Sequence, residues 1–142
     1  MNSAQGEVTL RASADLVWRI VGNFNGLHLW HPAVTGSELS AGSNNAVGAE
    51  RLLTLDGGGT ISERLLAWSD SERRYRYCIL ESPLPVSGYE SEVCVEDLGE
   101  GRCRVVWSGT FAAAGVADGQ AVEVVRGVYA GGLDYLREQF AG

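Results

Sequence analysis

The stretch Thr60-Ile61-Ser62-Glu63-Arg64-Leu65-Leu66-Ala67-Trp68 alternates between its two faces with the two-residue period of a β-strand. This alternation places Glu63 on the same face as Ile61, Leu65 and Ala67, which is the apolar face that turns toward a core. A charged carboxylate costs much free energy to bury unless it is paired. Glu63 therefore predicts a buried partner or a functional site.

The preceding segment supplies a candidate partner. Alternation along Gly48–Leu55 places Arg51 on the same face as Ala49, Leu53 and Leu55. An inward arginine would then accompany the inward glutamate. Because a buried ion pair is often no more stable than well-packed apolar residues of the same volume, stability alone explains this pair poorly.

A third inward polar group stands in the segment Ser87–Val95. Tyr89 shares a face there with Ser91, Val93 and Val95, whereas Glu90 and Glu92 face the other way. One interpretation is a cavity in which Arg51, Glu63 and Tyr89 converge on a ligand. The alternative is a one-residue β-bulge that turns one or more of them outward.

Short turns separate the strands of this chain, which favours an antiparallel meander. We expect strands over Glu7–Arg11, Gly36–Leu39, Gly48–Leu55, Thr60–Trp68, Arg73–Glu81, Ser87–Glu96 and Arg102–Phe111. The glycines at 57–59 join two of these strands, so they indicate a hairpin turn rather than a phosphate-binding loop.

Two helical regions flank the strands. Ser13 is the expected N-cap of a helix that runs to about Phe24, and a short helical turn should follow over Leu27–Trp30. Asp118 is the expected cap of a long helix to about Phe140, whose apolar residues are spaced by three and four. The expected apolar stripe consists of Val122, Val125, Tyr129, Leu133, Leu136 and Phe140.

Three glycines interrupt the long helix, at Gly127, Gly131 and Gly132. Each costs roughly 1 kcal/mol relative to alanine in a helix, so each needs a compensating reason. Close approach of the helix to the sheet would supply one, and so would room for a ligand. The alternative is a frayed segment that faces solvent.

The composition restricts the class of protein. A chain of 142 residues fits one domain, over 1–142, and this size allows a core with room for a pocket. The net charge of −7 and the pI near 4.7 argue against partners with an anionic surface, both nucleic acids and membranes. The N-terminus has no basic or apolar leader pattern, so we expect a cytoplasmic protein.

Metal and cofactor motifs are not evident. His28 and His31 lie three residues apart without a third ligand nearby, which argues against a metal site and favours a rim formed with Trp30 and Pro32. The three cysteines lack metal-ligand spacing and should be reduced; they are Cys78, Cys94 and Cys103. No dinucleotide fingerprint or nucleophile elbow is present, so we expect no cofactor.

Apolar and aromatic residues on the inward faces are the candidate walls of the cavity. The expected ligand-binding residues are Trp30, Leu53, Tyr75, Tyr77, Trp107, Phe111 and Tyr129. Ordinary core packing is the alternative for such residues in strands.

The order of elements, with the segment Phe24-Asn25-Gly26-Leu27-His28-Leu29-Trp30-His31-Pro32 after the first helix, resembles the START/Bet v 1-like (SRPBCC) superfamily. Within it, the chain is most similar to the polyketide cyclase/dehydrase and lipid transport family. This resemblance implies an α+β helix-grip fold. Such a fold has a curved antiparallel sheet of about seven strands around a long C-terminal helix, two short helices after the first strand, and an internal cavity.

A narrower resemblance is to the lachrymatory factor synthases of plants. It rests on Val47-Gly48-Ala49-Glu50-Arg51, on a glutamate in the next strand, and on a Gly-x-Tyr-like strand entry. The resemblance implies that Arg51, Glu63 and Tyr89 line the pocket and take part in rearranging a small molecule. Most other wall residues and the hairpin around Gly57–Gly59 depart from that pattern, so the substrate does not carry over.

Two hypotheses of function follow from these residues. In the first, a cofactor-free enzyme acts on a small, mainly apolar, oxygen-bearing molecule by isomerisation, cyclisation or dehydration. Glu63 would be the general acid or base, Arg51 would stabilise an oxyanion, and Tyr89 would donate a hydrogen bond or relay a proton. In the second, a carrier of small hydrophobic ligands or lipids uses Arg51 to hold a ligand carboxylate or hydroxyl. A partner-binding module with an exposed apolar patch is a third, weaker alternative.

Overall fold

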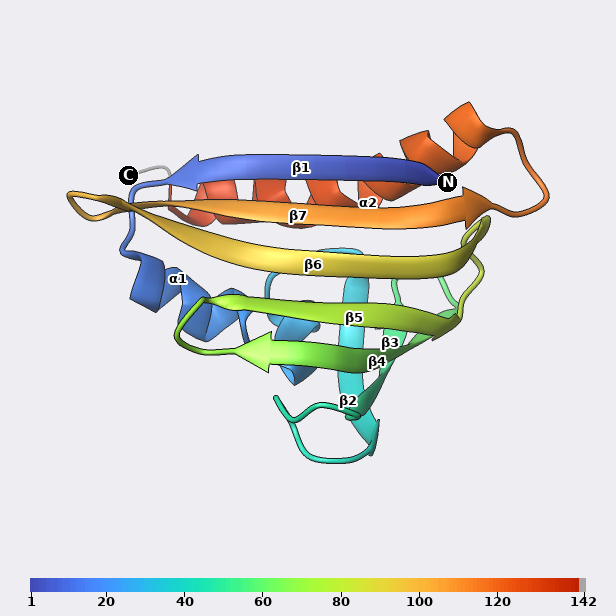
Figure 1. Ribbon diagram of the computed structural model, residues 1–142, viewed down its shortest axis with the longest axis horizontal. Coiled ribbons are helices and arrows are strands. Elements are labelled where there is room, and N and C mark those ends of the chain that lie inside the picture. The colour runs from blue at the N-terminus through green and yellow to red at the C-terminus, as the bar shows by residue number, and fades with distance from the viewer. Residues whose placement is uncertain (141–142) are drawn as a thin grey trace.

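A single antiparallel sheet curves around a long helix (Figure 1). Six strands that follow one another in the chain form a meander, and the first strand of the chain pairs with the last as an edge strand. The computed structural model describes residues 1–140. Its elements are β1 (Asn2–Leu10), α1 (Ala14–Val21), the 3-10 helix η1 (Phe24–Leu29), β2 (Val34–Ala41), β3 (Glu50–Leu55), β4 (Thr60–Ser69), β5 (Arg74–Glu81), β6 (Val86–Gly99), β7 (Arg102–Ala113) and α2 (Asp118–Gln139). The strand order is β1-β7-β6-β5-β4-β3-β2. This arrangement confirms the expected helix-grip α+β fold.

The first strand begins earlier than its sequence predicts. It starts at Asn2 rather than Glu7 and pairs with β7 from Asn2 opposite Phe111 to Leu10 opposite Cys103. The inward residues of its first half are small, so they carry little apolar signal. Their small size lets α2 approach the sheet, because a Cβ at Gly6 would lie 2.9 Å from Leu133 Cδ1.

The two short helices are divided differently from the prediction. Ser13 is the N-cap as expected, and its Oγ accepts from the Leu16 N–H at 3.2 Å. The helix ends at Val21, however, and Phe24 opens η1 instead of closing α1. A distant turn fixes this start, since the Phe24 N–H donates to Asn45 Oδ1 at 2.9 Å.

The long helix lies behind β1 and β7 in Figure 1. Its buried face includes Val125, Tyr129, Leu133 and Leu136, as the spacing predicts. Ala117, not Asp118, occupies the N-cap position, and no side chain caps the helix. The Asp118 carboxylate instead accepts a hydrogen bond from Asn2 Nδ2 at 3.1 Å, which ties the helix start to the edge strand.

Of Gly127, Gly131 and Gly132 in this helix, two allow close approach. A Cβ at Gly132 would lie 2.9 Å from Trp30 and 3.1 Å from both His31 and Trp107. A Cβ at Gly131 would lie 3.0 Å from the His31 ring. Gly127 is exposed and has open space around it, so the solvent-facing alternative holds at that position.

The expected alternation of β4 ends in a bulge. The β4–β5 register shifts between Leu65 and Ala67, and Ala67 faces outward rather than inward. Trp68 is half-buried instead, and its Nε1–H donates to the Gly22 carbonyl at 2.8 Å. Because the inversion comes after Leu65, Glu63 keeps its inward position.

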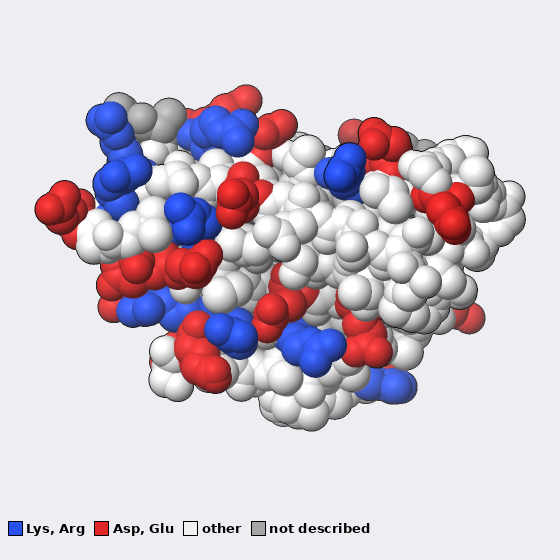
Figure 2. Space-filling model, turned by 45° about the horizontal axis from the view of Figure 1, so that its top comes forward, with Lys and Arg blue, Asp and Glu red and all other residues white. Residues whose placement is uncertain are grey.

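The outward face of the sheet is polar and balanced in charge. Arginine and acidic side chains are interspersed over it (Figure 2), and several pair across strands, such as Arg64–Glu50 at 3.0 Å. Cys78, Cys94 and Cys103 are free thiols. Over residues 1–140, every helix is too short or too polar to cross a membrane.

Candidate ligand cavity and its buried ion pair

A cavity of about 180 Å³ lies between the inward face of the sheet, η1 and α2. Its lining residues are Leu27, His31, Ala33, Val34, Leu53, Leu55, Asp56, Ile61, Glu63, Tyr77, Ile79, Leu84, Tyr89, Trp107 and Val128. Most of them are apolar or aromatic. Ala33 and Asp56 are exposed, so the cavity reaches the surface beside the β3–β4 turn.

Arg51 and Glu63 form an ion pair at the inner wall of this cavity. They stand directly opposite each other on β3 and β4. Arg51 Nε–H and Nη2–H both donate to Glu63 Oε1, at 2.9 and 2.7 Å. Arg51 is 0% exposed, and its Nη1–H donates to the Phe24 carbonyl. Its guanidinium carbon also lies 4.2 Å from the centre of the Phe24 ring.

The two carboxylate oxygens of Glu63 therefore differ. Oε1 accepts both arginine hydrogen bonds, whereas no donor within residues 1–140 is bonded to Oε2. Glu63 lines the cavity and Arg51 does not. The ion pair thus presents one acceptor oxygen to a ligand and keeps the cation behind it.

Burial sets the proton affinity of this carboxylate. Desolvation raises the pKa of Glu63 above its usual value, and the charge and hydrogen bonds of Arg51 offset part of the rise. Desolvation lowers the pKa of Arg51, but the charge of Glu63, the neighbouring Tyr75 and Tyr77 and the hydrogen bonds to Glu63 together raise it above its usual value, so the guanidinium remains charged. A carboxylate with a raised pKa that remains beside a fixed cation suits a general base.

A chain of buried hydroxyl groups begins at the cavity wall with Tyr77 and Tyr89 and continues behind it. Trp107 Nε1–H donates to Tyr77 Oη at 3.1 Å, and Tyr77 Oη lies 3.3 Å from Tyr89 Oη. Tyr89 Oη lies 2.6 Å from Tyr129 Oη, which lies 3.2 Å from Ser91 Oγ. The Ser91 hydroxyl donates to the Ser108 carbonyl at 2.8 Å.

The carbonyl at the end of this chain fixes its direction, because a carbonyl can only accept. Ser91 gives its proton to that carbonyl, so Tyr129 donates to Ser91, Tyr89 donates to Tyr129, and Tyr77 donates to Tyr89. The Tyr89 proton is held in the shortest bond of the chain and the Tyr77 proton in the longest. Tyr77 is thus the phenol whose proton is most easily turned toward a ligand.

The phenols of this chain are acids that stay protonated at neutral pH. Burial raises the pKa of Tyr77 and of Tyr89 well above the ordinary value, and it raises the pKa of Tyr129 to about 12. None of the three is therefore a base under ordinary conditions.

His31 closes the cavity on the helix side. Its Nε2–H donates to the Val128 carbonyl at 2.6 Å, and its Nδ1 accepts from the Ala33 N–H at 3.2 Å. This pair of bonds requires the neutral ring, and burial lowers the pKa of His31 in agreement. His31 thus joins α2 to the chain that enters β2.

The structure places the predicted site residues at two depths. Glu63, Tyr89, Leu53, Tyr77 and Trp107 line the cavity, whereas Arg51, Trp30, Tyr75, Phe111 and Tyr129 are buried behind its walls. Ile61 and Ile79, which strand alternation places inward, also line it. Leu84 and Val128 also line it, and no local pattern in the sequence indicates them.

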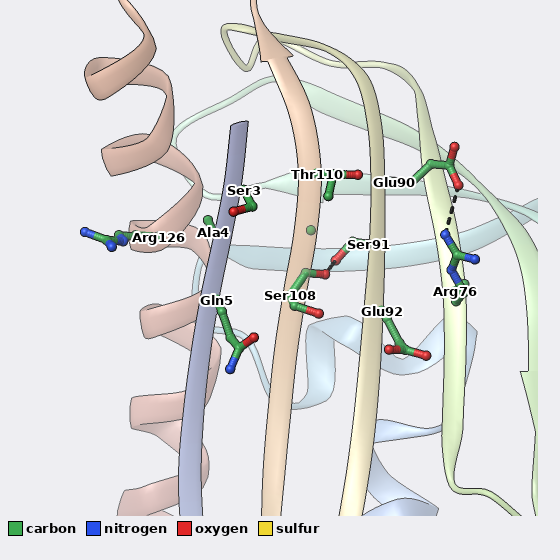
Figure 3. A pocket seen from close by; sticks show the side chains of 11 residues that line it. Ser3, Ala4, Gln5, Arg76, Glu90, Ser91, Glu92, Ser108, Thr110 and Arg126 are labelled. Carbon is green, nitrogen blue, oxygen red and sulfur yellow. Dashed lines mark hydrogen bonds and ion pairs between the residues drawn. The ribbon is translucent and has the colours of Figure 1, made fainter. Parts of the chain in front are cut away.

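A larger hollow of about 490 Å³ lies mainly over the outward face of the sheet (Figure 3). Ser3 and Gln5 of β1, and Ser108 and Thr110 of β7, line it as exposed or half-exposed polar side chains. On its far side, Arg76 is already paired with Glu90 at 3.1 Å. This hollow is open and lacks the buried free acceptor that marks the inner cavity.

Solved structures of bacterial proteins match this fold over nearly the whole chain. The protein XoxI from Bacillus cereus is 34% identical, with a TM-score of 0.93, over 99% of this chain and 96% of its own. A putative uncharacterized protein from Bacillus thuringiensis is also 34% identical, with a TM-score of 0.92, over 99% of this chain and 100% of its own.

The ZhuI aromatase/cyclase from Streptomyces sp. R1128 is 20% identical over 97% of this chain and 92% of its own, with a TM-score of 0.78, which shows the shared fold alone. No curated protein matches the sequence. The family model for polyketide cyclase/dehydrase and lipid transport matches residues 1–141. The chain therefore belongs to the polyketide cyclase/dehydrase and lipid transport family.

Proposed function

We propose that this protein binds a small, mainly apolar, oxygen-bearing molecule in the inner cavity and converts it by cofactor-free acid/base chemistry. The observation that carries the proposal is Glu63, a buried carboxylate that lines the cavity and has one oxygen held by Arg51 and the other without a hydrogen-bond donor among residues 1–140. The family match supports a ligand of the type that cyclases and dehydratases use.

Glu63 Oε2 is the proton acceptor in this proposal. It removes a proton from an acidic C–H or O–H bond of the bound molecule. In an isomerisation the same proton returns to another atom of that molecule, and in a dehydration it leaves with the hydroxyl group as water. Glu63 is only 4% exposed and its neighbours in the cavity wall are mainly apolar, so electrostatic interactions are stronger there than in water.

Arg51 acts through Glu63 in this proposal. Its three bonded N–H groups are taken by Glu63 and the Phe24 carbonyl, and it does not line the cavity. A direct role as oxyanion donor therefore has no support from its position. Arg51 is better described as a positioning residue that fixes the carboxylate and holds its charge.

Tyr77 and Tyr89 are the candidates for hydrogen bonds to a ligand oxygen. Both line the cavity, and the Tyr77 proton is held in the weaker bond. A phenol that donates to a ligand carbonyl would stabilise the negative charge that develops when Glu63 removes a proton. Tyr77 takes this role more readily than Tyr89.

The alternative function is a carrier that binds the same class of molecule without converting it. The family description includes lipid transport, which supports this alternative. The version in which Arg51 binds a ligand carboxylate is not favoured, because Arg51 is fully buried behind Glu63. A carrier would use the cavity and the tyrosine hydroxyls alone.

Native mass spectrometry separates the two functions. The wild type, Glu63→Gln and a control variant, Glu38→Gln, would be exposed to a metabolite extract and gently repurified. Glu38 is an exposed glutamate on β2, so its variant controls for the loss of one charge.

We expect Glu63→Gln to retain a small molecule that the wild type and Glu38→Gln convert, seen as a product in their flow-through. The same unchanged molecule retained by all three proteins would reject the enzyme and support the carrier.

A further inference from the structure

The cavity offers a ligand one unsatisfied acceptor, whereas each of its donors already has a partner, the Tyr77 hydroxyl in the longest of these bonds at 3.3 Å. The His31 Nε2–H is given to the Val128 carbonyl, and the Trp107 Nε1–H is given to Tyr77 and Ser91. The Tyr89 proton is committed to Tyr129 at 2.6 Å. Glu63 Oε2, by contrast, is an acceptor that no donor of residues 1–140 satisfies.

The charges around the cavity disfavour anions. Its lining includes two carboxylates, Glu63 at the inner wall and Asp56 at the rim. The nearest buried cation is Arg51, which is bonded to Glu63 and the Phe24 carbonyl. No arginine lies among the described residues that line the cavity. A carboxylate or phosphate would therefore lose its hydration without gaining a cation.

The charge balance also favours a neutral ligand over a cation. Arg51 already offsets the charge of Glu63 through two hydrogen bonds to Oε1. A second cation at Oε2 would lie close to the buried guanidinium, and like charges repel strongly where the dielectric constant is low. A neutral hydroxyl or N–H satisfies the free oxygen without this penalty.

The volume limits the size of the ligand. A cavity of about 150 Å³ holds one benzene molecule in another protein, so roughly one six-membered ring with one small substituent fits a cavity of about 180 Å³. Ligands with several fused rings would require the walls to move.

We infer that the cavity selects neutral hydrogen-bond donors of about one ring in size, such as small phenols, enols and alcohols, through Glu63 Oε2. This inference rests on the proposed function in one respect, since it concerns the same carboxylate. It concerns binding alone, however, and holds for a carrier as well as for an enzyme.

A set of size-matched probes tests this selectivity by isothermal titration calorimetry. Phenol is a neutral donor, anisole is an acceptor only, toluene is neither, benzoate is an anion and benzylamine is a cation. We expect phenol to bind the wild type at least tenfold more tightly than each of the other four. Tenfold corresponds to about 1.4 kcal/mol.

The Glu63→Gln variant gives the sharper result. Arg51 donates to the position of Oε1, so the amide oxygen of the substituted side chain should take that position and its NH2 group should face the cavity. The site then becomes a donor, and the preference for phenol over anisole should vanish or reverse. The exposed-charge control Glu38→Gln should keep the wild-type order.

Size is tested with 2-naphthol and the variant Ile79→Ala. Ile79 lines the cavity and is half-buried, so its truncation enlarges the site with limited loss of the core. We expect 2-naphthol to bind the wild type at least tenfold more weakly than phenol and to gain in Ile79→Ala.

Three results would overturn the inference. They are equal binding of toluene and phenol, tighter binding of benzoate or benzylamine than of phenol, and no binding of phenol at millimolar concentration.

Failure of the proposed function is distinct from these results. A phenol preference that Glu63→Gln reverses, without conversion of any metabolite, would reject catalysis and keep the selectivity. Conversion of an anionic or multi-ring metabolite would support catalysis and reject the selectivity.

Discussion

The two carboxylate oxygens of Glu63 differ in their hydrogen-bond partners. Oε1 accepts from Arg51 twice, whereas Oε2 has no donor among residues 1–140, and Glu63 lines the cavity. The pairing lowers the free-energy cost of burying the carboxylate, and the unpaired oxygen remains available to accept a hydrogen bond from a ligand. Both properties depend on the directly opposed positions of Arg51 and Glu63 in the β3–β4 register.

The substitution Arg51→Met tests the dependence of Glu63 on its cation. It leaves the carboxylate buried without a partner, so we expect the free energy of unfolding at neutral pH to fall by about 3–5 kcal/mol in urea titrations. The double variant Arg51→Met/Glu63→Leu should recover most of this loss, because no charge then remains buried. Equal losses in the single and double variants would show that Arg51 contributes by packing rather than by pairing.

At the scale of elements, the second half of α2 is shaped by the residues it passes. Gly131 and Gly132 let the helix approach Trp30, His31 and Trp107 closely. Two of these three residues, His31 and Trp107, also line the cavity. The glycines thus lower the intrinsic helix propensity of this stretch, but they let the helix pack closely against residues of the cavity wall.

Gly132→Ala and Gly127→Ala form a matched pair on this helix. A Cβ at position 132 would contact three ring systems at 2.9–3.1 Å, so we expect destabilisation despite the better helix propensity of alanine. A Cβ at position 127 meets nothing within 4 Å, so we expect stabilisation by up to about 1 kcal/mol. Thermal and urea unfolding of both variants measure the difference. A gain in stability for Gly132→Ala would contradict the close approach.

At the scale of the whole molecule, the cavity is enclosed by parts of the chain that are distant in sequence. His31 precedes β2, the sheet strand farthest from β1, and bonds to Val128 in the last helix. The start of η1 is fixed in a similar way by Asn45, which lies between β2 and β3. These contacts join the segment before β2 to α2, and the start of η1 to the loop between β2 and β3.

His31 should make the stability of the molecule depend on pH. Burial lowers the pKa of His31 in the folded state below the ordinary value of 6.5, so the unfolded chain binds the proton more tightly. The stabilising contribution is present above pH 6.5 and is lost as the pH falls through the folded-state pKa. The loss cannot exceed about 1.4 kcal/mol per pH unit for one proton.

Unfolding in urea between about pH 7.5 and 5, for the wild type and His31→Gln, measures this contribution. Glutamine can donate to the Val128 carbonyl but does not titrate, so the variant should lack the part of the slope that His31 causes. The variant His28→Gln, which changes the other histidine, should keep it. Identical slopes in the wild type and His31→Gln would contradict the proposed linkage.

Local patterns were sufficient to predict much of the fold. Alternation in β3, β4 and β6 correctly placed Arg51, Glu63 and Tyr89 inward, because successive side chains of a strand face opposite sides whatever the tertiary structure. The apolar spacing of α2 predicted its buried face for a similar reason. The departures occur where the period fails, at the bulge near Ala67 and at the small residues of β1.

Sequence patterns were enough to predict which residues face inward, how many strands form, and that a buried carboxylate accompanies a buried arginine. Packing of the folded chain was needed to learn that Glu63 borders the cavity while Arg51 lies behind it, that the tyrosine protons follow one direction, and that His31 bonds to α2. This division arises because periodicity fixes the face of a side chain but not its depth. Depth and hydrogen-bond partners depend on how the curved sheet and the helix pack together.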